Sequence, residues 1–312
     1  MIKLEKVSKS FGKTTALKEV SFQARFGAIT GFLGPNGAGK TTTMRLISGY
    51  LNADSGELTV NGLHHRHNSL QIRANMGYLP ENNPLYPDMT VLEYLFLVAR
   101  LRQLDALHAK KSVAEMIDLC GLEGRLNQTL GTLSKGYRQR VGLAQAMIHD
   151  PEILILDEPT TGLDPNQIGE IKELIRELGS SKTLLLSTHI LHQVPELCDE
   201  VVILNEGRVV FAGTPKALVD QAGAPRVAWL EINADPEAMQ RFFGKEDAVS
   251  AIDQQKHHNG LHCFRLEGNF SAENMVGLAK KLHAQNLEIS RWAAEPPSLE
   301  QVFAGLTARG EV

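Results

Sequence analysis

The residues with the clearest chemical capacity lie in one glycine-rich stretch near the start of the chain. Residues 34–41 match the pattern G-x-x-x-x-G-K-[ST] at every fixed position, and Thr42 follows them. Glycines allow the backbone to fold back, so that successive N–H groups point at phosphate oxygens. Lys40 can then place its ammonium between β- and γ-phosphates, and the Thr41 hydroxyl can take one Mg²⁺ position. The predicted phosphate-binding residues are Gly34, Pro35, Asn36, Gly37, Ala38, Gly39, Lys40, Thr41 and Thr42.

The sequence on either side supplies the elements that such a loop needs. Residues 28–33 are apolar and β-prone, and residues 42–47 are compatible with a helix. A strand, a loop and a helix in this order place the positive end of the helix next to the bound phosphates. A glycine-rich turn that contains a lysine by chance would not need these flanking elements, so we favour a nucleotide site.

Two adjacent carboxylates form the second strong signal. The four apolar residues 153–156 predict a strand that is buried on both faces of a parallel sheet. Asp157 and Glu158 follow this strand at its carboxyl end, where ligands bind in open α/β sheets. Asp157 can hold Mg²⁺ through water, and Glu158 can orient or deprotonate a water aimed at the γ-phosphate. The alternative is an acidic turn without a chemical role.

Three further stretches carry weaker signals. His189 follows the apolar strand 184–187 and could reach the γ-phosphate, but a histidine at a strand end can equally be structural. Phe11, in the segment 10–13, could stack on a nucleotide base or could be a core or turn aromatic. Within residues 133–140, Ser134 is a candidate N-cap and Gly136 would let the backbone approach an anion.

Composition indicates an ordinary soluble globular protein. The 312 residues are 43% hydrophobic and 22% charged, and the formal net charge is −4. Nucleic-acid binding is not expected, because it usually shows as a basic excess. No apolar run approaches the roughly 18–20 residues of a membrane span, and the first residues lack a signal-peptide core. Three widely spaced cysteines indicate reduced, mostly buried thiols, so we expect a cytoplasmic protein: Cys120, Cys198 and Cys263.

The order of predicted elements indicates an α/β nucleotide-binding domain followed by a smaller α+β domain. Residues 1–222 form the first, with a helical subdomain at about 88–150. Residues 220–225 resemble a linker, and residues 226–312 form the second domain. Its βαββαβ order predicts a ferredoxin-like fold, with a final helix at 297–307.

Taken together, the motifs resemble those of the ATP-binding subunits of ABC transporters. The resemblance covers about residues 1–220 and rests on Gly34–Thr42, the signature region Leu133–Tyr137, Asp157-Glu158, the D-loop Gly162–Asp164 and the switch histidine His189. Residues 296–303 further resemble the ABC-2-type exporter group, and residues 80–86 resemble its gliding-motility-type branch.

The chain departs from the family pattern at two places. Lys135 and Tyr137 replace one Gly and the Gln of the usual L-S-G-G-Q signature, whereas Ser134 and Gly136 are kept. Glu81 occupies the position of the Q-loop Gln, which is expected to join Mg²⁺ and the attacking water to the membrane partner. A carboxylate can bind Mg²⁺, but it adds negative charge near a triphosphate.

The resemblance implies an ATP hydrolase that uses ATP and Mg²⁺ and forms a head-to-tail homodimer around two ATP. The implied catalytic residues are Lys40, Glu158 and His189; the implied metal-binding residues are Thr41, Glu81 and Asp157; and Phe11, Ser134, Gly136, Tyr137 and Asp164 join the phosphate loop in binding ATP. A membrane permease would dock near Glu81–Tyr86, which places the protein on the cytoplasmic face of the membrane.

Three other classes stay open from the sequence. One is a soluble ABC-type ATPase that acts on nucleic acid, ribosomes or an assembly pathway. The second is a P-loop kinase for a small metabolite, which would not need the signature region. The third is a binding scaffold without turnover, to which Glu81 points. The C-terminal domain would support dimerisation or packing, or else serve regulation or partner recognition.

Overall fold

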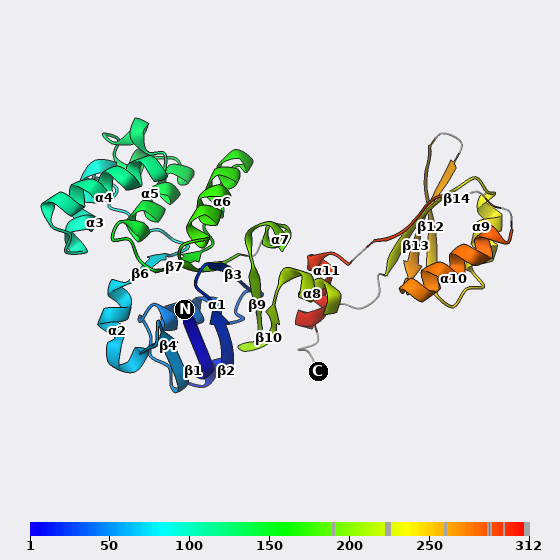
Figure 1. Cartoon of the computed structure of the whole chain (residues 1–312), viewed down its shortest axis with the longest axis horizontal. Helices are drawn as coiled ribbons and strands as arrows, with labels where there is room; N and C mark the ends of the chain where they lie inside the picture. Colours follow the sequence, from blue (N-terminus) through cyan, green and yellow to red (C-terminus); the bar gives the residue numbers. More distant parts are fainter. Residues whose placement is uncertain are drawn as a thin grey trace. The chain divides into compact units, whose positions relative to one another are not determined.

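The computed structural model describes residues 1–188, 191–221, 226–258, 261–285, 287, 289–295 and 297–308 (Figure 1). The chain divides into two compact units. Met1–Pro215 belong to the first, together with the segment that begins at Leu306, and Lys216–Gly305 form the second. The domain limits predicted from the sequence, 1–222 and 226–312, stay a prediction.

The centre of the first unit is a mixed sheet of six strands in the described residues, in the order β10-β9-β3-β8-β7-β6. Neighbouring strands are parallel except β10, which is antiparallel to β9. All residues of β3, β7 and β8 are buried, as expected for strands covered on both faces. Their carboxyl ends therefore share one edge of the sheet. The strands are β3 (Ala28–Leu33), β6 (Met76–Leu79), β7 (Ile153–Asp157), β8 (Thr183–Ser187), β9 (Glu200–Asn205) and β10 (Arg208–Gly213).

An antiparallel sheet packs against this centre, with the order β2-β1-β4-β5 among the described strands. One hydrophobic core joins the two sheets, and within it the rings of Phe22 and Phe32 lie 5.2 Å apart. Buried residues of the helix after the phosphate loop, such as Met44, belong to the same core. The elements are β1 (Ile2–Phe11), β2 (Thr14–Ala24), α1 (Lys40–Ile47), β4 (Ser55–Val60), β5 (Leu63–His64) and α2 (His65–Ala74).

Helices α3, α4 and α5 pack together as the predicted helical subdomain (Figure 1). Thr90 and Glu93 form a capping box at the start of α3, and Asp105 caps α4. The apolar residues at positions 91, 92, 95, 98 and 101 predict one stripe on α3, but Leu101, the last residue of the helix, is 68% exposed and does not share the burial of Val91, Leu95 and Val98. The helices are α3 (Val91–Leu101), α4 (Ala106–Leu119), α5 (Lys135–Met147), α6 (Pro165–Gly179) and α7 (Val194–Leu197), with short 3-10 turns at Glu123–Arg125, Leu130–Thr132 and Leu191–Gln193.

The second unit has the predicted βαββαβ order, and its sheet order is β12-β13-β11-β14 with all pairs antiparallel. Residues of α9 and α10 share one core with the sheet. The predicted linker is wrong at its start, because Asp220 and Gln221 complete α8. The elements are α8 (Pro215–Gln221), β11 (Val227–Ile232), α9 (Pro236–Phe243), β12 (Val249–His258), β13 (Leu261–Gly268), α10 (Ala272–His283), β14 (Ile289–Glu295) and α11 (Leu299–Ala308).

Candidate nucleotide-binding site

The glycine-rich loop connects β3 to α1, as the sequence predicts. β3 ends at Leu33, and α1 begins at Lys40 with Gly39 as its N-cap. Gly39 has φ +107°, and a Cβ there would lie 2.6 Å from Leu17 Cδ2 and 2.9 Å from Ala16 O. Both the backbone conformation and the lack of space therefore require glycine at this position. The loop thus fits tightly against β2 while its N–H groups precede a helix N-terminus.

Lys40 lies within this loop and faces carboxylates. Its Nζ donates hydrogen bonds to Gly34 O at 2.7 Å and Pro35 O at 3.2 Å. Burial lowers the pKa of Lys40, and the carboxylates of Glu158, then of Asp157 and Glu81, oppose this shift. The ammonium is thus held by neutral carbonyl oxygens, which a phosphate group could replace as stronger partners.

A cleft of about 460 Å³ lies over the loop. This volume is in the usual range for sites of small molecules, about 300–1,000 Å³. The cleft brings together eight residues that the sequence predicts for ATP or metal binding, and both Lys40 and Glu158, which it predicts for catalysis. Its lining consists of Ala16, Asn36, Gly37, Gly39, Lys40, Thr41, Thr42, Glu81, Asp157 and Glu158.

A serine on the neighbouring strand contacts both Asp157 and Glu158. β8 lies between β3 and β7, and its register pairs Ser187 with Phe32 on one side and Asp157 on the other. The Ser187 hydroxyl donates a hydrogen bond to Asp157 Oδ1 and accepts one from the Glu158 N–H at 3.1 Å. Sequence reasoning missed Ser187. A hydroxyl residue at the end of a parallel strand next to that of Asp157 was the available signal.

Asp157 is buried, and Glu158 has an unusual backbone conformation. Asp157 is 4% exposed, and this burial raises its pKa, with the hydrogen bond from Ser187 opposing the shift. Glu158 has φ 53°, which is uncommon for a residue with a side chain, and Thr161 Oγ1 donates to its Oε2 at 3.1 Å. The Glu158 side chain lines the cleft beside Asp157. Unusual backbone conformations of this kind are common among residues that contact a substrate.

The donor set of the cleft fits Mg²⁺ better than a metal held by protein alone. No group of three His, Cys, Asp or Glu side chains among the described residues is disposed to bind a metal. Mg²⁺ is usually held by one or two carboxylates, waters and the phosphates of its substrate. Thr41, Glu81 and Asp157 line the same cleft and supply oxygen ligands of this kind.

Four of the other predicted ATP-binding residues lie at the starts of α5 and α6, a region here called the signature surface: Ser134, Gly136, Tyr137 and Asp164. The predicted residues Gly34, Pro35 and Ala38 belong to the phosphate loop but do not line the cleft. Ser134 caps α5 and Asp164 caps α6, where it accepts a hydrogen bond from Gln167 N at 3.0 Å. A Cβ on Gly136 would collide with the Gln167 side chain, so the starts of α5 and α6 are packed together. None of these four residues lines the cleft around Lys40.

Phe11 and His189 belong to other segments of the chain. Phe11 ends β1 and is 48% exposed; it lies on the hairpin that leads to Ala16, which lines the cleft. Ala16 was not predicted, because a small residue outside any motif carries no signal of its own. His189 lies outside the described residues.

The whole chain is similar to proteins of one family. The linearmycin resistance ATP-binding protein LnrL of Bacillus subtilis is 31% identical over 316 residues, which cover 99% of each protein. The chain belongs to the ABC transporter family of ATP-binding proteins. The family model described as ABC transporter matches residues 17–161. The Nod factor export ATP-binding protein I of Paraburkholderia xenovorans is 33% identical over 314 residues, or 99% of this chain and 97% of that protein.

Solved structures of ABC proteins share the fold. A structure of the ATP-binding subunit of an ABC transporter has a TM-score of 0.66 and 31% identity, over 71% of this chain and 93% of that one. The dimeric bacterial ABC transporter cassette MJ0796, also solved with ADP and phosphate, has a TM-score of 0.63 and 26% identity, over 69% of this chain and 98% of the cassette. The predicted ABC-type fold class is confirmed.

These findings confirm the main functional prediction over the alternatives of a kinase or a scaffold. The ABC protein described here is an ATP-binding, ATP-hydrolysing subunit of a transporter. Among the similar proteins, MJ0796 is dimeric and has been solved with ADP and phosphate, and cbiO1 of Clostridium perfringens is part of the ABC transporter complex cbiONQ. Within the described ranges, no helix has both the length and the apolar character needed to cross a bilayer.

Proposed function

We propose that this subunit drives an ABC-2-type exporter by binding and hydrolysing MgATP in a head-to-tail homodimer on the cytoplasmic face of the membrane. The observation that carries the proposal is the convergence of Lys40, Asp157 and Glu158 on one cleft over the phosphate loop. A cation for phosphate, a buried carboxylate for a metal and a second carboxylate for water are the groups that phosphoryl transfer to water needs.

Each residue of the cleft has one task in the proposed reaction. Lys40 and the N–H groups of the loop bind the phosphates, and Glu158 accepts a proton from the water that attacks the γ-phosphate. Thr41 and Asp157, with Glu81 nearby, would hold Mg²⁺, which neutralises phosphate charge. Ser187 keeps Asp157 in place through its hydrogen bond. His189 is proposed to sense the γ-phosphate.

The signature surface gives the reason for a homodimer. Ser134 is exposed at the start of α5, and Asp164 is exposed at the start of α6. Helix N-termini attract anions, and these two do not face the cleft of their own chain. We therefore place each ATP between Gly34–Thr41 of one chain and Ser134–Tyr137 of its partner. The dimeric form of the similar cassette MJ0796 supports this arrangement.

The membrane partner is proposed to dock at residues 81–86. Tyr86 is 58% exposed, and its ring lies edge-on against Tyr94 of α3 at 6.0 Å. An exposed aromatic beside the cleft residue Glu81 suits a contact that couples hydrolysis to a permease. Export is supported by the similar protein that is named for Nod factor export. We expect no nucleic-acid partner, because the net charge is −4.

A Glu158→Gln variant tests the proposal. Hydrolysis should be lost while ATP binding is kept, because the amide cannot accept the proton from water. The tagged variant, captured from detergent-solubilised native membranes with ATP and Mg²⁺, should bring down a polytopic membrane protein in near-stoichiometric amount. Wild-type hydrolysis by the variant would contradict the role of Glu158, and recovery of ribosomal or DNA-bound partners would contradict the exporter.

A further inference from the structure

Phe11 is half-exposed at the end of β1, although it is a large apolar side chain. Its strand partner in β2 is Thr14, two residues before Ala16. Because Ala16 lines the cleft, the hairpin carries Phe11 to the margin of the nucleotide site. What orients this exposed ring is therefore a question of function as well as of packing.

A lysine covers the Phe11 ring. Lys9 Nζ lies 5.6 Å from the ring centroid, within the range of about 6 Å for a cation–π contact. The same ammonium lies 2.7 Å from Asp54 Oδ1. The Lys9 side chain is only 15% exposed, so this cation is held between a carboxylate and a ring. A free lysine in water would not be confined in this way.

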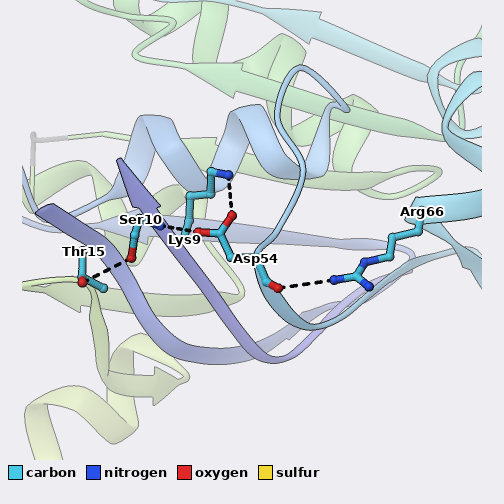
Figure 2. A network of polar contacts seen from close by, with 5 residues as sticks. All are labelled: Lys9, Ser10, Thr15, Asp54 and Arg66. Atoms are coloured by element: carbon cyan, nitrogen blue, oxygen red, sulfur yellow. Dashed lines mark hydrogen bonds and ion pairs between the residues drawn. The ribbon is translucent and has the colours of Figure 1, made fainter. Parts of the chain in front are cut away.

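Asp54 also holds the backbone of β1 just before Phe11, and Figure 2 shows its bonds to Lys9 and Ser10. Its Oδ2 accepts a hydrogen bond from Ser10 N at 2.7 Å, and its own N–H donates to Ser8 O at 3.0 Å. The bond from Lys9, then that from Ser10, lowers the pKa of Asp54, so the carboxylate stays ionised. Arg66 donates to the Asp54 carbonyl at 3.5 Å.

The pairing of β1 with β2 is irregular towards this end of β1. The register of β1 with β2 shifts between Lys9 and Ser10, and also before Lys9. Beyond the shift, a side-chain bond of 3.3 Å joins Ser10 Oγ to Thr15 Oγ1 across the hairpin (Figure 2). The pairing resumes with Ser10 opposite Thr15 and Phe11 opposite Thr14. Because such an irregularity redirects side chains, the contacts of Asp54 act together with the ladder in orienting the last residues of β1.

We propose that Lys9 and Asp54 are positioning residues that orient the Phe11 ring for stacking on the nucleotide base and so set the affinity of the site for the base. The inference rests on the proposed function, because it needs nucleotide in the cleft beside Ala16. Lys9 occupies ring surface on one side, and the exposed remainder of the ring is offered to the base. A cation on one face draws electron density from the ring, which favours stacking on an electron-rich purine.

The test compares a ligand that has a base with one that has none. Binding of ADP is measured by titration calorimetry. Binding of inorganic tripolyphosphate, at millimolar concentrations, is measured by how far it stabilises the protein against thermal unfolding. Lys9→Met should weaken ADP binding about two- to fivefold, as expected for one cation–π contact, and leave tripolyphosphate unchanged. Asp54→Ala should weaken ADP binding at least as much. Lys13→Met, at the exposed turn of the same hairpin, is the matched control and should bind both ligands like wild type.

A double-mutant cycle separates positioning from a general structural role. If Lys9 acts through the ring, Lys9→Met should cause no further loss of ADP affinity in a Phe11→Ala background. Lys9→Arg, which keeps the cation, should restore most of the affinity. An equal loss in the Phe11→Ala background, or an equal loss for tripolyphosphate, would overturn the inference. Failure of the proposed site would look different: Lys40→Met would then bind ADP as wild type does.

Discussion

The phosphate cleft and the signature surface both lie at the start of a helix, but only the cleft is enclosed by side chains from other segments of the same chain. Both place glycine at or near the start of a helix, Gly39 before α1 and Gly136 in α5. At the cleft, Asp157 and Glu158 arrive from β7 and enclose the loop from the far side. At the signature surface, Ser134 stands exposed at the helix start. One chain therefore lines the phosphate cleft from both the loop and the end of β7, whereas Ser134 and Asp164 of the signature surface are exposed.

The difference separates what one chain can do alone from what needs a partner chain. Parallel strands that share one sheet edge bring distant residues together, which is how Lys40 and Asp157 meet. The starts of α5 and α6 contact each other, through Gly136 and Gln167, and present their capping residues outward. Substitutions in the cleft should therefore affect nucleotide binding by the monomer, whereas those on the signature surface should affect only steps that need a partner chain.

The largest effect is expected for Lys40→Met. This change removes the cation of the cleft while it keeps most of the side-chain volume. Hydrogen bonds to charged groups contribute up to about 3 kcal/mol, so ADP binding should weaken by about a hundredfold. Calorimetry on the monomer measures it, with Lys13→Met as the control that removes a lysine elsewhere. A loss below about threefold would mean that Lys40 does not contact phosphate.

A smaller effect, of a different kind, is expected for Ser134→Arg. A bulky cation at the start of α5 should block the partner's nucleotide and lower ATP hydrolysis about tenfold or more, the cost of one charge-assisted hydrogen bond. ADP affinity of the monomer should stay within about twofold, since Ser134 does not line the cleft. Ser134→Thr keeps the cap and the hydroxyl and should hydrolyse ATP nearly like wild type. A matching loss of ADP affinity in Ser134→Arg would erase the contrast between the two surfaces.

The smallest effect is expected on stability, for Asp157→Asn. Burial raises the pKa of Asp157 in the folded protein above its value in the unfolded chain. The stability that Asp157 contributes is therefore fully present below the unfolded-state pKa, and it is lost as the pH rises through the folded-state pKa. The asparagine carries no charge, so the variant should gain about 1–3 °C in Tm at neutral pH. Below about pH 4 the gain should vanish. Circular dichroism during heating at both pH values measures this. An equal gain at both, or none, would contradict the electrostatic cost of Asp157.

Much of the fold could be predicted because local patterns carry it. The apolar run of β7 and the phosphate loop between a strand and a helix read directly as a parallel-sheet nucleotide domain, and the βαββαβ order of the second unit was visible as well. The failures lie at element ends. Leu101 repeats the apolar period of α3 but falls in its exposed last turn, and Asp220 was assigned to a linker although it lies in α8.

The residues of the candidate site could be predicted where they belong to a recognisable motif. Lys40, Asp157 and Glu158 stand in motifs, and Glu81 stands in a position that the family defines. Ser187 was missed because its role depends on which strand lies beside β7. Lys9 and Asp54 were missed for the same reason, since 44 residues separate Ser10 from the carboxylate that holds it.

The sequence by itself determined the chemistry: a triphosphate loop, a carboxylate pair and the order of motifs of an ABC protein. These depend on short stretches whose residue types and local backbone preferences act without the rest of the chain. Only the tertiary structure decided which residues stand next to one another. The order of the strands puts Ser187 against Asp157, and the fold of the unit brings Asp54 to Lys9 and Ser10, next to Phe11. Such neighbours follow from packing over the whole unit, which no local pattern encodes.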